Sequence, residues 1–212
     1  MTSSLRTPIL VVGGGPAGMN MALNLAYWET PCIIVNELGS TPNHPQGNTN
    51  NARTMEHYRR LGIAEEIRTV GLPSGHSGDA ICVTRVNGFE MGRIALPSNG
   101  ERVTHGFEEL DFTPEPSHRA SQMFVEEILK RHIDACPLID VRFGWRMLSF
   151  QQDDCGVHAE IENLSTGQKS LVIADFLVGC DGGQGTIRKN LGINFKGKNG
   201  EERDFMMGRM LS

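Results

Sequence analysis

A glycine-rich segment near the start of the chain has the residue types and spacing of a nucleotide-binding turn. The hexapeptide Gly-Gly-Gly-Pro-Ala-Gly begins at Gly13 and satisfies the pattern G-x-G-x-x-G. In such a turn Gly13 lets the chain leave a strand sharply, Gly15 leaves room for a pyrophosphate, and Gly18 lets the following helix pack closely. Pro16 and Ala17 would open that helix, whose free backbone amides attract phosphate. A tight strand-to-helix turn that binds nothing is the alternative interpretation.

Two polar residues follow the next apolar run. Residues 31–35 read Pro-Cys-Ile-Ile-Val, and Asn36 and Glu37 come directly after them. Glu37 lies 19 residues beyond Gly18 (37 − 18), where a dinucleotide-binding fold places an acidic side chain on the ribose hydroxyls. The sequence therefore predicts a ribose contact at Glu37. A solvent-exposed loop carboxylate is the alternative.

A third polar position ends an apolar run late in the chain. The residues Val-Gly-Cys-Asp-Gly-Gly begin at Val178, so Asp181 and Gly182 follow an expected buried strand. Open α/β folds bind ligands at the carboxyl edge of the sheet, and Asp181 could accept a hydrogen bond from a ribose or ribityl hydroxyl there. The alternative is an Asx turn, in which the Asp181 carboxylate caps the helix that follows.

The remaining pattern predicts the elements that would position these residues. Short apolar runs and alternating segments indicate strands at residues 8–12, 31–35, 141–150, 156–163, 169–173 and 175–180, with a hairpin at 79–96. Apolar residues at helical spacing indicate helices at residues 17–27, 52–61, 63–70, 121–136 and 186–191. We therefore expect an α/β fold with a parallel central sheet and a β-meander over residues 141–173.

These motifs, in this order, resemble those of the class A FAD-dependent aromatic-ring monooxygenases, the family of phenol hydroxylase and p-hydroxybenzoate hydroxylase. The residues Asn-Ala-Arg-Thr-Met-Glu at 51–56 are similar to the family's helix after the second strand. Ser-Gln at 121–122 with Glu126 resembles the helix whose glutamine contacts the flavin. Gly-Cys-Asp-Gly at 179–182 resembles the family's Asp-Gly motif. The resemblance begins at Pro8 and continues to the end of the chain.

The resemblance implies a fold, cofactors and an activity. It implies an FAD/NAD(P)-binding, Rossmann-like parallel sheet with a β-meander and part of a substrate layer. FAD would be the cofactor, NADPH or NADH a transient co-substrate, and an aromatic or polyketide-like small molecule the substrate to be hydroxylated. Motifs and resemblance together predict that the cofactor is bound by Gly13, Gly15, Pro16, Ala17, Gly18, Asn36, Glu37, Gln46, Arg53, Gln122, Asp181 and Gly182. No residue is assigned as a catalytic acid or base.

Three features depart from the family's pattern. Asn36 stands where the family has a ribose-binding Glu, and Gln46 stands where it has an Arg near the flavin. Members of the family are also much longer, so we expect this chain to be the N-terminal half of such an enzyme. A non-catalytic or accessory remnant of an FAD-binding domain is the alternative.

The resemblance also predicts a division of the chain. Residues 1–70 and 118–195 would form the FAD-binding domain, residues 71–117 a partial insertion of the substrate domain, and residues 196–212 the start of a truncated substrate domain. By itself the chain is not expected to hydroxylate efficiently. The reaction needs a dry and ordered cavity, and in the family a later Gly-Asp segment and the rest of the substrate domain help to form it. Uncovered apolar surface is expected to favour self-association.

Composition and charge exclude several other classes. The net charge of −5 gives no general attraction to nucleic acid or anionic membranes. Seven histidines and five cysteines show no spacing typical of a metal site, so no metal is expected. The N-terminus has no apolar signal segment, and no apolar run is long enough to cross a bilayer. We expect a cytoplasmic protein with no nucleic-acid or membrane partner, and homo-oligomerisation is left open.

Overall fold

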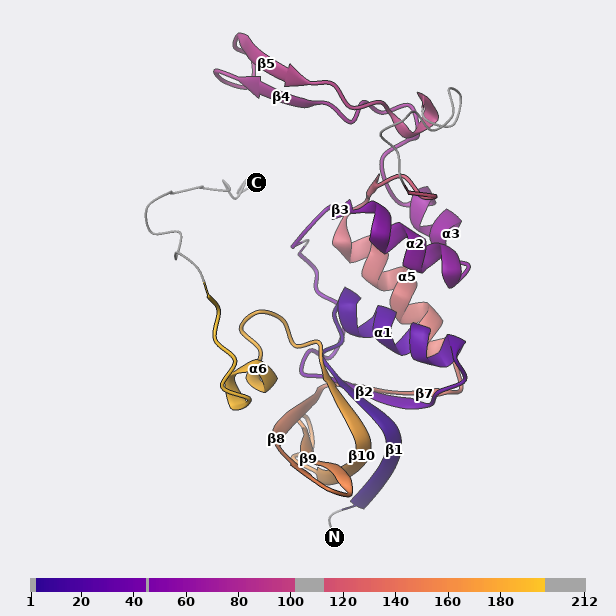
Figure 1. Cartoon of the computed structure of the whole chain (residues 1–212), viewed down its shortest axis with the longest axis vertical. Helices are drawn as coiled ribbons and strands as arrows, with labels where there is room; N and C mark the ends of the chain where they lie inside the picture. The colour runs from indigo at the N-terminus through magenta and orange to yellow at the C-terminus, as the bar shows by residue number, and fades with distance from the viewer. Residues whose placement is uncertain (1–2, 45, 102–112, 197–212) are drawn as a thin grey trace.

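The computed structural model describes residues 3–44, 46–101 and 113–196, and its centre is a six-stranded sheet (Figure 1). The strand order is β7-β2-β1-β10-β9-β8. The strands are β1 (Ser3–Val12), β2 (Cys32–Asn36), β7 (Ile139–Phe143), β8 (Trp145–Asp153), β9 (Gly156–Asn163) and β10 (Lys169–Gly179). The first four in this order run parallel, and β9 and β8 continue the sheet antiparallel. The predicted α/β class with a mostly parallel sheet is confirmed.

Helices cover one face of the sheet (Figure 1). α1 (Pro16–Tyr27) and α5 (Gln122–Ala135) contact the sheet, whereas α2 (Ala52–Arg60) and α3 (Ala64–Thr69) pack farther out, with α3 against α5. A short α6 (Thr186–Asn190) follows β10. Val11 of β1, Met19 of α1 and Leu129 of α5 share one core cluster and are fully buried. The apolar residues of α1 and α5 recur at helical spacing, so each helix has one apolar stripe, and this stripe packs on the sheet.

The antiparallel end of the sheet covers the other face. Leu10 of β1, Ile33 of β2 and Ile161 of β9 belong to a second core cluster. β8 contacts β2 although three strands separate them in the sheet order, so the sheet curls back on itself (Figure 1). Successive side chains of β1 are thus buried on opposite faces, which explains its continuous apolar run.

The single strand predicted at residues 141–150 is wrong, because the chain turns at Gly144. This glycine has φ +75°, a conformation that favours glycine. Before it, β7 pairs parallel with β2, and after it, β8 pairs antiparallel with β9. The meander consequently consists of β8, β9 and β10, and β7 lies at the opposite edge of the sheet.

The strands predicted separately at residues 169–173 and 175–180 form one strand, β10. β1 pairs with it from Ser3 to Val12, so its ladder continues across the expected gap. β9 pairs with β10 only as far as Ala174, and this loss of a neighbour changes the burial pattern midway. The same long ladder explains why β1 begins at Ser3 rather than at the predicted Pro8.

Between α3 and α5 the chain leaves the sheet. β4 (Ala80–Val83) and β5 (Glu90–Ile94) form the predicted hairpin, which projects away from the helices (Figure 1). Its apolar side chains are open to solvent in the described structure; Val86 is 96% exposed and Phe89 84%.

Two short strands lie at the root of this excursion. β3 (Thr49–Asn50) and β6 (His118–Arg119) pair antiparallel, where the sequence indicated only loop. They are too short for a periodic pattern to reveal them. The expected irregular stretch at 97–117 includes residues 102–112, which lie outside the described residues.

Candidate functional site

The glycine turn lies where β1 ends, and its inner side is packed against the end of β10. Gly13 has φ +109°, and its amide donates to the carbonyl oxygen of Val35 over 2.8 Å. A Cβ atom at position 13 would lie 2.2 Å from the carbonyl oxygen of Cys180. Gly13 is therefore required both by its backbone conformation and by the approach of β10.

The packing continues at the next two glycines. A Cβ atom on Gly14 would lie 2.8 Å from Cζ of Phe143, at the end of β7. A Cβ atom on Gly18 would lie 1.8 Å from the carbonyl oxygen of Gly13, so the first turn of α1 rests directly on the glycine turn. The predicted reason for Gly18, close packing of the helix, is confirmed by this contact.

Gly15 differs from these glycines because it faces open space. It is the N-cap of α1 with φ −76°, and no heavy atom of the described structure lies within 4 Å of a Cβ placed on it. Pro16 occupies the first helical position, Ala17 and Gly18 follow, and no described side chain caps this helix end. The first-turn amides lack intrahelical partners, and the space beside Gly15, which a side chain at this position would fill, is open. We call this open space the cradle. A pyrophosphate fits such a cradle.

Asn36 reaches the glycine turn, whereas Glu37 does not. The Asn36 Oδ1 accepts a hydrogen bond from the Gly14 amide over 3.1 Å, and its Nδ2 lies 3.4 Å from the carbonyl oxygen of Leu38. The Glu37 carboxylate instead pairs with Arg146 of β8 over 3.3 Å and is 59% exposed. Glu37 therefore has the position of a solvated carboxylate, which was the alternative interpretation of this residue.

Asp181 and Gly182 follow β10 beside the turn. The Cys180 amide donates to the Val12 carbonyl over 2.7 Å, which holds the end of β10 against the end of β1. The Asp181 Oδ2 accepts a hydrogen bond from the Ile187 amide over 3.1 Å, in the first turn of α6. Asp181 therefore has the capping contact foreseen as the alternative, and its role toward a cofactor hydroxyl stays a prediction. Gly182 has φ +81°, which lets the chain turn away from the sheet.

Cys180 is the titratable group packed beneath the turn. Burial raises the pKa of its thiol, and the charge of Asp181 raises it further. The thiolate is the reactive form of cysteine, so the thiol of Cys180 is poorly reactive at neutral pH. Its side chain also lies on the packed side of Gly18, 3.3 Å from where a Cβ would stand.

A second group of predicted residues gathers at the start of α5. The amide of Gln122 donates to the carbonyl oxygen of Gly47 over 3.0 Å, which places the exposed loop residue Gln46 close to this helix end. The Gln122 side chain donates through Nε2 to Oε1 of Glu126 over 2.5 Å. Arg53 belongs to neither group: its side chain is 74% exposed and pairs with Glu56 over 2.5 Å.

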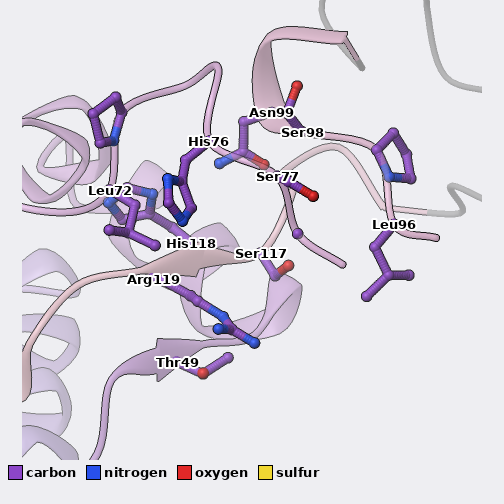
Figure 2. Close-up of a pocket in the computed structure, with 13 residues that line it drawn as sticks. Thr49, Leu72, His76, Ser77, Leu96, Ser98, Asn99, Ser117, His118 and Arg119 are labelled. Atoms are coloured by element: carbon purple, nitrogen blue, oxygen red, sulfur yellow. The ribbon is translucent and has the colours of Figure 1, made fainter. Parts of the chain in front are cut away.

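A cavity of about 200 Å³ lies at the root of the hairpin (Figure 2). Thr49, His118 and Arg119 are part of its wall. Burial lowers the pKa of His118, and the charge of Arg68 lowers it further. No residue of the glycine turn lines this cavity, and ligand sites commonly enclose roughly 300–1,000 Å³. This cavity is therefore separate from the glycine turn.

The described ranges hold neither a metal-binding group nor a membrane-spanning helix. No three His, Cys, Asp or Glu side chains are grouped there so that they could hold a metal ion. Among the helices of those ranges, none is long and apolar enough to cross a membrane.

The family described as FAD binding domain matches residues 6–210. The chain belongs to this family. The glycine turn, the end of β2 and the end of β10 are thus parts of an FAD binding domain, and the resemblance seen in the motifs is confirmed. FAD is the cofactor of the family, and the open cradle at Gly15 is a place that its pyrophosphate fits.

Curated relatives of this FAD binding domain carry monooxygenase and hydroxylase names. The chain is 35% identical over 192 residues to the FAD-dependent monooxygenase apdD of Emericella nidulans, covering 89% of this chain and 31% of the relative. It is 37% identical over 196 residues to the aklavinone 12-hydroxylase DnrF of Streptomyces peucetius, covering 89% of this chain and 38% of the relative. The chain therefore spans about a third of the length of these relatives.

Solved structures show the same architecture. The rebeccamycin biosynthetic enzyme RebC in its substrate-free form superposes with a TM-score of 0.78 at 37% identity, covering 90% of this chain and 36% of that one. The flavin-dependent monooxygenase PieE, solved with FAD and substrate, gives a TM-score of 0.83 at 31% identity over 93% of this chain and 34% of its own.

Two residues at the site were given no role by sequence reasoning. Phe143 packs beneath Gly14, and only the unexpected end of β7 at this residue brings it there. Glu126 binds Gln122, and the sequence indicated it only as part of the family pattern. A signal for it was present in the sequence, because Glu126 is a charged residue on the apolar stripe of Val125, Leu129 and Ile133.

Proposed function

We propose that this chain supplies the FAD-binding part of an NAD(P)H-dependent monooxygenase that hydroxylates an aromatic or polyketide-like small molecule. The observation that carries the proposal is the open side of Gly15 at the uncapped N-terminus of α1, in a chain that belongs to the FAD binding domain family. The names of the relatives apdD and DnrF support the reaction class and the kind of substrate.

In this proposal the residues of the chain bind and orient the cofactor. The amides at the start of α1 hold its pyrophosphate, where the helix dipole favours negative charge. Asn36 at the end of β2 would hold a ribose hydroxyl beside the turn, and Gln122 with Gln46 would contact the flavin end. When bound, FAD supplies the redox chemistry with NADPH or NADH as the reductant. No residue of this chain is assigned a proton-transfer role.

Partners and location are also part of the proposal. The partner is a small aromatic molecule, and the PieE structure, solved with FAD and substrate, supports a substrate as the partner. The apolar side chains exposed on the β4–β5 hairpin support self-association or contact with another protein surface. All five cysteines are free thiols, which supports a reducing compartment such as the cytoplasm.

The direct test is the visible spectrum of the purified protein, followed by FAD titration with fluorescence quenching as the readout. A yellow protein, or saturable quenching, supports the proposal. Reduction of the bound flavin by NADPH or by NADH, followed as loss of colour without oxygen, then identifies the reductant. A colourless protein that quenches no flavin fluorescence would favour the alternative, a remnant of the domain that binds no cofactor. One observation favours that alternative: the Oδ1 and Nδ2 atoms of Asn36 both have hydrogen-bond partners within the chain, Gly14 and Leu38.

A further inference from the structure

Glu126 is a buried carboxyl group without a cationic partner. It lies on the second turn of α5, is 1% exposed, and forms no ion pair with any described residue. Burial raises the pKa of Glu126, and the hydrogen bond from Gln122 partly opposes this. A buried carboxyl group is unfavourable unless it makes compensating hydrogen bonds, so its presence here calls for a reason.

One oxygen of Glu126 has a partner, and the other has none. Oε1 accepts from Nε2 of Gln122 over 2.5 Å, and Oε2 is buried without a hydrogen bond in the structure. Tyr58 of α2 is the titratable neighbour: burial raises its pKa to about 12, with the charge of Glu126 as the second cause. The polar contact that Glu126 makes is thus with Gln122, one helical turn before it.

This contact determines how the Gln122 carboxamide is turned. Because Nε2 faces Glu126, Oε1 must point the other way. It does so toward the loop at Gly47, where a Cβ atom would stand 3.5 Å from it. Against an ionised carboxylate, which only accepts, the opposite rotation would set the amide oxygen against a carboxylate oxygen and would lose the bond. The amide oxygen of Gln122 is therefore presented on the side of the Gly47 loop.

We propose that Glu126 is a positioning residue for FAD binding, which fixes the orientation of the Gln122 carboxamide toward the flavin. The inference rests on the proposed function, because it assigns the Gln122 contact to the cofactor. A neutral acid group at position 126 can still accept from Gln122 through its carbonyl oxygen, although only the ionised carboxylate, which has no donor, excludes the opposite rotation. Glutamine offers the same acceptor in the same shape, whereas methionine and leucine fill the space without it.

The test compares FAD affinity among variants of the whole chain. Glu126→Met is expected to weaken binding about fivefold to tenfold, the usual effect of one lost hydrogen bond. Glu126→Leu is a second apolar variant, and melting curves identify any variant that does not fold. Glu126→Gln is expected to stay within about twofold of wild type. Glu127→Met, which removes an exposed carboxylate from the same helix, is the matched control and is expected to have no effect.

A double-mutant cycle distinguishes positioning from a general packing role. If Glu126 acts through Gln122, then Glu126→Met has no further effect in a Gln122→Leu background. Equal weakening in both backgrounds would overturn the inference, as would a Glu126→Gln variant that binds FAD as poorly as Glu126→Met, or a Glu126→Met variant that binds it normally.

A second readout needs no cofactor. The side-chain amide resonances of Gln122, assigned by their loss in Gln122→Leu, are expected to shift in Glu126→Met and to stay in place in Glu127→Met. Unchanged resonances in Glu126→Met would contradict the positioning role. A wild-type protein that binds no FAD, with the resonance shift present, would instead overturn the proposed function and the flavin part of this inference together.

Discussion

The two sides of the glycine turn show different reasons for glycine. On the packed side, Gly13 and Gly18 leave no room for a side chain, because backbone oxygens lie 2.2 Å and 1.8 Å from where their Cβ atoms would stand. On the open side, nothing lies within 4 Å of the same position on Gly15. Folding therefore explains the first two glycines and leaves the third unexplained. We propose that a ligand on the open side is the reason for glycine at position 15.

Gly18→Ala is expected to have the largest effect on stability. Its methyl group would meet the Gly13 carbonyl oxygen, and overpacking of this kind typically costs about 1–3 kcal/mol, only partly offset by better helix propensity. The melting temperature should fall by roughly 2–12 °C, since 1 kcal/mol corresponds to about 2–4 °C in a protein of this size. Gly15→Ala is the matched control, with a change of under about 1 kcal/mol. Equal melting curves for the two variants would remove the distinction between the sides.

Thiol labelling is expected to show the packed side directly. Cys82 and Cys155 are exposed, whereas burial and the Asp181 charge raise the pKa of Cys180. Less Cys180 thiolate is then present at a given pH, and its side chain is packed beneath the turn, so Cys180 should label slowly. At about pH 8 we expect Cys180 to label more slowly than Cys82 and Cys155, as followed by mass spectrometry of peptides. If Cys82, Cys155 and Cys180 were labelled at one rate, the end of β10 would not be packed against the glycine turn.

Asn36→Glu is expected to tighten FAD binding by several-fold. Asn36 lies next to the turn, and charge-assisted hydrogen bonds are roughly twice as strong as neutral ones. Fluorescence titration gives the affinity, with Asn36→Asp as a shorter acidic control. A weaker complex would mean that the bond from the Gly14 amide to Asn36 matters more than a charge at the ribose.

Glu37→Ala is expected to have the smallest effect on FAD affinity, less than about twofold. The Glu37 carboxylate points to Arg146 rather than to the turn, and exposed ion pairs contribute only about 0–1 kcal/mol. Arg146→Ala is the matched control, because it removes the same pair from the other strand. A larger loss of FAD affinity in Glu37→Ala than in Asn36→Ala would place the ribose at Glu37 instead.

The unit that forms the turn could be predicted from the sequence because its signals are local. The apolar run before Gly13, the glycines themselves and the helical spacing after Pro16 all lie within a short stretch. The order of strand, helix and strand followed from these residues, and β1, α1 and β2 confirm it with parallel strands.

Features that depend on distant parts of the chain could not be predicted in this way. The turn at Gly144 separates β7 from β8 because the two strands pair with different neighbours, and the alternating pattern runs through it unchanged. The bond from the Gly14 amide to Asn36 joins residues 22 positions apart. Asp181 had two interpretations that its local sequence could not separate, and the contact with Ile187 appears only when α6 is in place.

The most direct test of the central claim is an FAD titration of wild type beside Gly15→Val, with a melting curve for each. The valine side chain would fill the cradle, and its backbone conformation at φ −76° is one that valine can adopt. We predict saturable FAD binding by wild type and an affinity at least about 100-fold lower in Gly15→Val, close to 3 kcal/mol. The melting curves should differ by no more than about 1 kcal/mol in stability. Equal FAD affinity in the two proteins would contradict the account and would make the motif a turn that serves folding alone.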